Sequence, residues 1–542
     1  MAEEQEQNTN PEMTAPGGPS RREFLKMGAG AVGALGTAGG SLRAMPRSSA
    51  AGNAARPNIV FFLQEGVRPD EYSSWKMAPW DSHGLSAMEN RIVSTPHLDR
   101  IVKEGISFPN AFTTYALCLP SRASILTGLY PHETGCIDNR ARTIPTDIPT
   151  IVEMLREAGY EVGFFGKIHV NGETQRKWDY YFGIESASAN YYHPVITESE
   201  NGRAKPPRQY EGYVDDIVTD HAIEWMSRKR DNPFCLLLWF VAPHAPFYRA
   251  RRYLDLYNGE RIPKPITFDE DLKGYPGKPL AFRTADNKIG STILGDDDPR
   301  SLEELVKDHL AGVVSNDDHA GNVMDALEKA GILDDTAIVI SADHGFFLGE
   351  WRFYDKRFMH EPSIRVPMAI RYPRLIQGGL APSEMALNID VPPTILELAG
   401  VKVPDWFQGH SLLPFGKGTP PSSWRKDWLY EYFEYPGVEE VKPNRGVRTE
   451  RYKLIHYFLA PEEYELYDLQ EDPGELHNLA YDPAHAQLRK QLSDRIDELR
   501  KDTGDVYQYE EPNVFEFQRQ KMNRPTGAQK PFDPESARPG NR

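Results

Sequence analysis

The sequence predicts an α/β protein with a large, mostly parallel sheet that is sandwiched by helices. Two observations indicate this: short apolar runs alternate with segments of helical spacing, and polar clusters directly follow the apolar runs. Strands buried on both faces are continuously apolar, and ligands gather at their carboxyl ends. A third observation is a change of sequence pattern beyond residue 405, where Pro and Gly interrupt the alternation and short strand-like runs follow. This change predicts a smaller C-terminal subdomain with an antiparallel sheet.

The elements follow one another in a regular order. The expected core strands are the apolar runs at 58–63, 161–165, 234–241 and 336–341. Helical spacing predicts helices over 95–105, 148–159 and 309–331, and a further helix starts near Ser121. Strands and helices that alternate in this way favour a parallel sheet with helices on both faces.

The chain divides into four expected regions. Residues 1–55 form a targeting segment with a linker, and residues 56–405 form the main α/β domain. Residues 406–502 form the smaller subdomain, with strands at 428–433, 452–457 and 464–469 and a helix over 482–501. Residues 503–542 are a polar, Pro-rich tail.

Composition excludes several classes of protein. The 542 residues carry a formal charge of −17, which disfavours nucleic acid as a partner. The sequence has no long apolar run suited to a stable membrane span. Three cysteines are too few for a disulfide scaffold; Cys136 and Cys235 are either buried thiols or a pair that forms after export.

The first 55 residues resemble a twin-arginine export signal. Arg21 and Arg22 precede a weakly apolar stretch from Met27 to Ser41, and small residues follow. This resemblance implies the twin-arginine export machinery as a partner and a periplasmic or extracellular location. The alternative is a Gly/Ala-rich tail that contains an RR pair by chance.

The segment 118–128, CLPSRASILTG, carries the strongest motif. It resembles the type I sulfatase signature, of the alkaline-phosphatase-like superfamily. The resemblance implies that a formylglycine-generating enzyme in the cytoplasm oxidises Cys118 to formylglycine (3-oxoalanine). One hydroxyl of its hydrate attacks the sulfur of a sulfate ester, and the other later expels sulfate. Arg122 is implied to hold this diol.

Three further segments match the same family pattern. Gly166–His169 implies that Lys167 neutralises the sulfate and that His169 takes a proton, which suits an imidazole. Pro243–Phe247 implies that His244 binds sulfate and protonates the leaving oxygen. The Asp-Lys pair that ends at Lys356 implies a lysine that holds a sulfate oxygen.

The expected metal site departs from the family pattern. The family binds one divalent ion, usually Ca²⁺, through two consecutive acids after the first strand and a later pair. Asp343 and His344 fit the later pair, but the early positions hold Glu65 and Gly66. The metal ligands are therefore expected to be Glu65, Asp343, His344 and the modified Cys118. The histidine shifts the preference modestly toward Mn²⁺, and the alternative is that Glu65 is a loop residue.

These motifs together predict an exported sulfatase that hydrolyses an aryl, small-molecule or carbohydrate sulfate ester. One alternative is a phosphonate monoester or phosphodiester hydrolase of the same superfamily. A second is a non-catalytic protein that binds sulfated glycans, which only the Glu65-Gly66 departure suggests. The substrate, endo or exo action and oligomeric state stay open.

Overall fold

The computed structural model describes residues 56–509, except 76–91, 141, 174–175, 177, 187–188, 271, 273–276, 286–299 and 438. The chain divides into two units, Met1–Ala54 and Ala55–Arg542, and every described residue belongs to the second. The predicted export signal and the tail beyond residue 509 lie outside the described residues. Among the helices described, none is long and apolar enough to cross a membrane.

The central sheet has ten strands, and its middle is parallel, as the apolar runs predict. The order along the sheet is β2-β13-β10-β1-β9-β4-β5-β6-β7, and β8 pairs with β6. Its parallel strands are β1 (Asn58–Gln64), β4 (Glu161–Lys167), β5 (Tyr180–Ile184), β9 (Phe234–Trp239) and β10 (Thr336–Ala342). Phe61 of β1 lies opposite Val339 and Leu237, and all three are buried because sheet neighbours and helices cover them.

Short strands complete this sheet and form two small ones. They are β2 (Ile106–Ser107), β3 (Ala111–Phe112), β6 (Val195–Glu200), β7 (Arg203–Ala204), β8 (Arg208–Gln209), β11 (Phe347–Leu348), β12 (Tyr354–Asp355), β13 (Met368–Arg371) and β14 (Ala386–Leu387). The outer strands of the central sheet pair antiparallel, which makes the sheet mixed at its edges.

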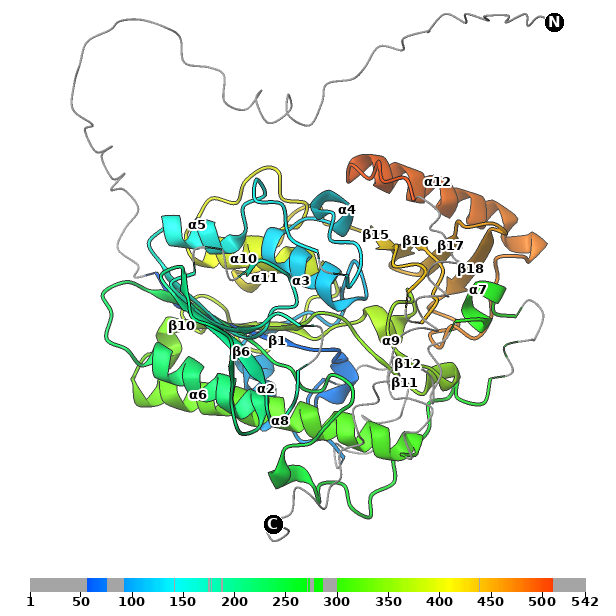
Figure 1. The fold of residues 1–542 in the computed structure, drawn as a ribbon. Helices are drawn as coiled ribbons and strands as arrows, with labels where there is room; N and C mark the ends of the chain where they lie inside the picture. Colours follow the sequence, from blue (N-terminus) through cyan, green and yellow to red (C-terminus); the bar gives the residue numbers. More distant parts are fainter. Residues whose placement is uncertain are drawn as a thin grey trace, which may run out of the picture. The chain divides into compact units, whose positions relative to one another are not determined.

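Helices cover both faces of the sheet (Figure 1). On one face lie α3 (Cys118–Thr127), α4 (Pro131–Thr134), α5 (Ile151–Glu157), α10 (Val391–Leu398) and α11 (Leu413–Gly416). On the other lie α2 (Pro96–Glu104), α6 (Val214–Met226) and α8 (Leu302–Lys329). Two helices begin earlier in the chain than the sequence predicted. Helix α3 begins at Cys118 and not near Ser121. Helix α8 begins at Leu302 and not at residue 309, and Ser301 caps it by accepting from the N–H of Glu304.

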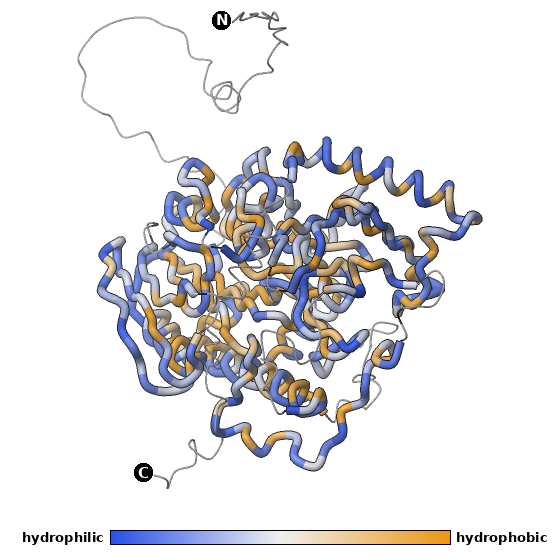
Figure 2. Tube along the Cα trace, turned by 45° about the vertical axis from the view of Figure 1, so that its right-hand side comes forward, coloured by the Kyte–Doolittle hydropathy of each residue, from blue (hydrophilic) through white to orange (hydrophobic). Residues whose placement is uncertain are grey.

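The C-terminal antiparallel sheet is also confirmed. It consists of β15 (Asp427–Tyr432), β16 (Asn444–Thr449), β17 (Tyr452–Tyr457) and β18 (Glu463–Asp468), and α12 (Ala486–Asp502) packs against it. Strand β16 is not among the strands expected from the sequence. The short helices α7 (Leu280–Arg283) and α9 (Glu361–Ile364) lie beside this sheet, while apolar residues concentrate in the interior (Figures 1 and 2). The domain boundary expected at residues 405 and 406 stays a prediction.

Candidate active site

The residues of the sequence motifs meet at the carboxyl edge of the parallel strands. Glu65 follows β1, Lys167 ends β4, and His244 follows β9. Asp343 and His344 follow β10. Because the carboxyl ends of parallel strands share one edge of the sheet, segments far apart in the sequence converge there.

Cys118, the first residue of α3, brings its thiol into this cluster. Its Sγ lies 3.0 Å from Oε1 of Glu65 and 3.4 Å from Nε2 of His344. Burial raises the pKa of the thiol, but the charges of Lys356 and Lys167 outweigh this effect and hold the pKa well below its usual value. The positive end of the α3 dipole favours a negative group at the same position.

Two buried cations hold the carboxylates of the cluster. Arg122 donates from Nη2 to Glu65 at 2.7 Å and from Nε to Asp343 at 2.9 Å. Lys167 donates to the same oxygen of Glu65 at 2.8 Å. Burial opposes the ionisation of Glu65, but Lys167 and Arg122 outweigh it and hold the pKa of Glu65 well below its usual range. Glu65 is therefore an anchored anion rather than a free loop residue.

Four of these residues form a donor set that fits a divalent cation. Donor atoms of Glu65, Cys118, Asp343 and His344 all lie within 4.8 Å of one another, and all four residues are buried. Nδ1 of His344 lies 2.7 Å from the carbonyl oxygen of Gly345, so Nδ1 carries the proton and Nε2 faces the cluster.

The protonation of His344 reflects the negative charge around it. Burial lowers the pKa of His344, but the Asp343 carboxylate outweighs it and raises the pKa to about 10. A divalent cation there would compensate the same charge, and a histidine that binds a metal must be deprotonated at the ligating nitrogen.

Gly66 fills the second early position without a side chain. Its N–H donates to Oδ1 of Asp343 at 3.0 Å, so its backbone orients this carboxylate. Its φ of +63° is one that side chains disfavour, and an added Cβ would lie 3.2 Å from Cε1 of His344. A side chain here would therefore press on His344 and on Phe346, whose Cδ2 would lie 3.1 Å from the added Cβ.

The two motif histidines differ in their surroundings. His169 is buried and contacts Cys118, and burial together with Lys167 lowers its pKa to about 4. Its Nδ1 has no hydrogen-bond partner among the described residues. His244 is partly exposed; its Nδ1 lies 2.6 Å from the carbonyl of Ala245, and its Nε2 lies 3.9 Å from Glu65. The neutral imidazole of His169 can therefore accept a proton.

Lys356 also reaches the cluster, through a network that the sequence analysis missed. Its Nζ lies 4.0 Å from Glu65 and 3.1 Å from Asp355. Arg357 pairs with Asp355 and, at 2.8 Å, with Glu439 of the C-terminal region. No local sequence pattern connects residues 355 and 439, so no motif could have found this support for Lys356.

Comparison with known protein families identifies the family of this chain. The family model described as Sulfatase matches residues 57–401, which is more than half of the chain. This chain belongs to the sulfatase family. A second model, described as N-sulphoglucosamine sulphohydrolase, C-terminal, matches residues 349–502 of this sulfatase. The sulfatase is thus a sulfuric ester hydrolase of the alkaline-phosphatase-like superfamily.

Named relatives agree with this assignment. The sulfatase is 34% identical over 505 residues to an N-acetylglucosamine-6-O-sulfatase of Bacteroides thetaiotaomicron, covering 82% of this chain and 86% of the relative. It is 29% identical to a choline-sulfatase of Rhizobium meliloti, covering 72% and 78%. A solved structure, in complex with its substrate D-glucosamine-2-N,6-O-disulfate, superposes with a TM-score of 0.74 at 32% identity, covering 83% of this chain and 99% of that one.

Proposed function

We propose that this sulfatase removes a sulfate ester from a carbohydrate, with a 6-O-sulfated glucosamine as the first substrate to test. The observation that carries the proposal is the buried cluster of Arg122, Lys167 and Lys356 around the Cys118 thiol, which suits a sulfate group. The sugar is suggested by the relatives, since the 34%-identical protein is an N-acetylglucosamine-6-O-sulfatase. The 32%-identical structure holds a sulfated glucosamine.

The nucleophile in this proposal is Cys118 after conversion to formylglycine in the cytoplasm. The hydrated aldehyde supplies one hydroxyl for attack on sulfur and a second for the release of sulfate. The structure supports position 118 for this role because a negative group there is stabilised by Lys356 and Lys167 and by the α3 dipole.

The surrounding side chains divide the work of binding and proton transfer. Lys167 and Lys356 neutralise sulfate oxygens, and Arg122 fixes the position of the carboxylates beside residue 118. His169 is neutral at physiological pH and beside Cys118, so it takes the proton that is lost when sulfate leaves. His244, which is more exposed, donates to the leaving oxygen from the substrate side.

A divalent cation at Glu65, Asp343, His344 and the modified residue 118 completes the proposed site. Bound there, it would stabilise negative charge on the sulfate. Ca²⁺ is the first expectation and Mn²⁺ the second, because the site includes one imidazole. Metal analysis of the protein from its own host identifies the ion, and Asp343→Asn should lower the content of that ion.

One pair of measurements tests the function. The mass of the tryptic peptide from Glu104 to Arg122 should show an aldehyde in place of the thiol of Cys118. Purified enzyme should release sulfate from glucosamine-6-sulfate faster than it cleaves phosphodiesters or phosphonate monoesters of matched leaving groups. An unmodified thiol in active enzyme contradicts the proposed nucleophile, and a faster phosphodiester reaction contradicts the proposed substrate class.

We also propose export by the twin-arginine route to the periplasm or medium. Arg21 and Arg22, followed by the weakly apolar stretch, support this. The route carries folded proteins, which is compatible with modification of Cys118 before export. Replacing both arginines with lysine should retain the enzyme in the cytoplasm; unchanged export of that variant would contradict the route.

A further inference from the structure

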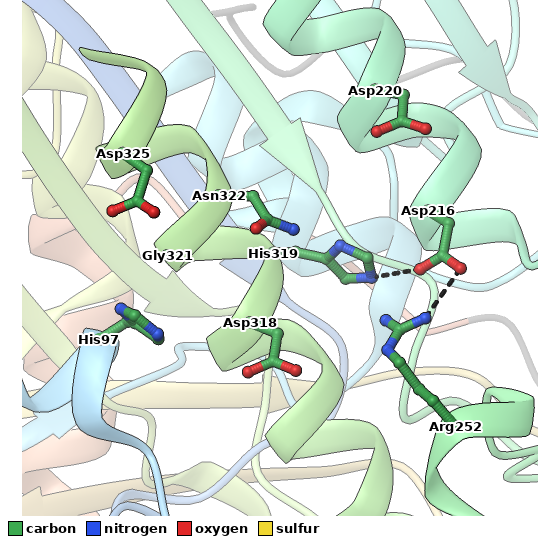
Figure 3. A pocket seen from close by; sticks show the side chains of 9 residues that line it. All are labelled: His97, Asp216, Asp220, Arg252, Asp318, His319, Gly321, Asn322 and Asp325. Carbon is green, nitrogen blue, oxygen red and sulfur yellow. Dashed lines mark hydrogen bonds and ion pairs between the residues drawn. The ribbon is translucent and has the colours of Figure 1, made fainter. Parts of the chain in front are cut away.

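A second cluster of ligand-type side chains lies in a pocket of about 350 Å³ between α2, α6 and α8 (Figure 3). Asp216 and Asp220 of α6 and Asp318 and Asp325 of α8 line it. Arg252 lies 2.8 Å from Asp216 and neutralises it. The described part of the chain gives no ion pair to the other three carboxylates, although the hydroxyl of Tyr253 donates to Oδ2 of Asp318, so the pocket attracts a cation.

The side of α8 that lines this pocket leaves room for the imidazole of His97. Asp318, Gly321 and Asp325 stand three and four residues apart and therefore lie along one side of the helix. Figure 3 shows the imidazole of His97, from the start of α2, between Asp318 and Asp325. A Cβ on Gly321 would lie 2.6 Å from Cγ of His97, so the imidazole approaches α8 only because residue 321 is glycine.

We infer that a divalent metal ion binds beside this pocket through His97 and Asp318, which line it, and through the adjacent buried Asp317. One donor atom from each of the three lies within 4.8 Å of the others, a spacing that a single ion can bridge. Asp317 is fixed in place, because its Oδ1 accepts the N–H of Leu98 at 2.7 Å. An imidazole with two carboxylates suits Mn²⁺ or Zn²⁺ better than Ca²⁺, which prefers oxygen ligands alone.

His319 provides an independent observation in the same pocket. It is only 2% exposed, and its Nε2 lies 3.2 Å from Oδ1 of Asp216. A proton on Nε2 leaves Nδ1 as an acceptor, and Nδ1 has no partner among the described residues. A buried acceptor without a donor costs free energy. Water carried by a bound ion would be such a donor, and His319 lines the same pocket as His97 and Asp318.

Carboxylates attract cations, and Asp317 and Asp318 place theirs beside the imidazole of His97. An ammonium group would also compensate this charge. It would not use the lone pair of His97, however, so the mixed imidazole and carboxylate set favours a metal ion.

The test counts Mn²⁺ bound to the full chain by equilibrium dialysis after metal is stripped. Wild type should bind one equivalent more than Asp318→Asn and His97→Gln, or bind it at least about tenfold more tightly. Both variants should keep sulfate ester hydrolysis, because neither residue touches the catalytic cluster. Asp343→Asn should lose the other equivalent and keep this one, which separates the two sites.

Asp220→Asn is the matched control, because it removes one charge from the pocket and none of the three ligands. It should bind Mn²⁺ like wild type, and Mn²⁺ should raise its unfolding temperature as it does for wild type, since the ion links α2 to α8. Equal stoichiometry in wild type, Asp318→Asn and His97→Gln would overturn the inference. An equal loss in Asp220→Asn would overturn it too, because charge alone would then explain the binding.

Discussion

The candidate catalytic cluster around Cys118 and the ion network between α9 and the C-terminal sheet bury the same kinds of side chain. In the network, Lys453 lies 2.7 Å from carboxylate oxygens of both Glu361 and Glu475. Arg365 and Arg448 hold Glu361 at 2.6 and 3.3 Å. Each of these five charged groups therefore has a close partner of opposite sign, and the network joins α9 to β16 and β17.

The catalytic cluster differs in having reactive atoms that its ion pairs leave available. Arg122 and Lys167 saturate one oxygen of Glu65, while the other faces the thiol of Cys118. His169 keeps an unpartnered Nδ1 among the described residues. Buried charge alone thus does not distinguish the two regions; the candidate active site adds reactive side chains that meet at the ends of parallel strands.

The largest expected effect is a loss of catalytic turnover, and it belongs to the candidate catalytic cluster alone. Cys118→Ser should lower multiple-turnover sulfate release by at least about 1,000-fold, because serine can accept sulfate but cannot expel it as a hydrated aldehyde does. The control is Cys136→Ser: burial raises the pKa of Cys136 to about 12, so its thiol is inert and turnover should persist. Normal turnover of the Cys118 variant would contradict the proposed nucleophile.

A substitution in the C-terminal network should lower the stability of the protein and leave its catalytic rate unchanged. Lys453→Met leaves Glu361 and Glu475 short of a buried cation, so the free energy of unfolding should fall by about 3–5 kcal/mol. Sulfate release per folded molecule should stay near that of wild type. Urea unfolding measures the first quantity and initial rates the second.

A surface lysine gives the reference for this prediction. Lys490 is paired with Asp494, yet its side chain is 75% exposed, so Lys490→Met should change stability little. If both lysine variants unfold at the same urea concentration as wild type, the buried network is not what holds the C-terminal sheet to α9.

The main strands and the motif residues could be predicted because their signals are local. Residues 59–63 of β1 are all apolar, which predicts a buried strand, and the polar Gln64 that follows lies at the strand end. Glu65, Cys118 and His344 were therefore expected together and are found together.

Features that depend on distant partners could not be predicted. Strand β16, NRGVRT, reads as polar, yet Arg445 and Arg448 are buried because Asp505 and Glu361 neutralise them. The pairing of Asp317 with the start of α2 spans about 220 residues of sequence. No local periodicity carries such information, since the partner exists only after the chain has folded.

A pH dependence tests another buried pair that supports the C-terminal sheet. Nδ1 of His132 lies 2.6 Å from Glu431, and Nε2 lies 3.0 Å from the carbonyl of Thr503. Burial lowers the pKa of His132, but Glu431 outweighs it and raises the pKa to about 9. A raised pKa gives stability that is full below about pH 6.5 and is lost as pH rises through about 9.

The comparison of wild type with His132→Asn isolates this contribution. Wild type should be more stable by up to about 3 kcal/mol at pH 6, and the difference should shrink at pH 8 and vanish by pH 10. Urea unfolding at the three pH values measures it. A difference that is constant across this range would mean that His132 contributes packing and not charge.

The smallest expected effect is that of a substitution at Gly66, in the candidate catalytic cluster. Its φ of +63° and the 3.1 Å approach of an added Cβ to Phe346 predict that Gly66→Ala lowers the free energy of unfolding by about 1–2 kcal/mol. Gly135→Ala is the matched control, with a φ of +71° and no atom within 4 Å of the new Cβ. Both variants should lose stability, but only Gly66→Ala should weaken metal binding, because its Cβ presses on His344. Equal metal affinity in the two variants would show that the bare backbone at residue 66 serves the turn alone.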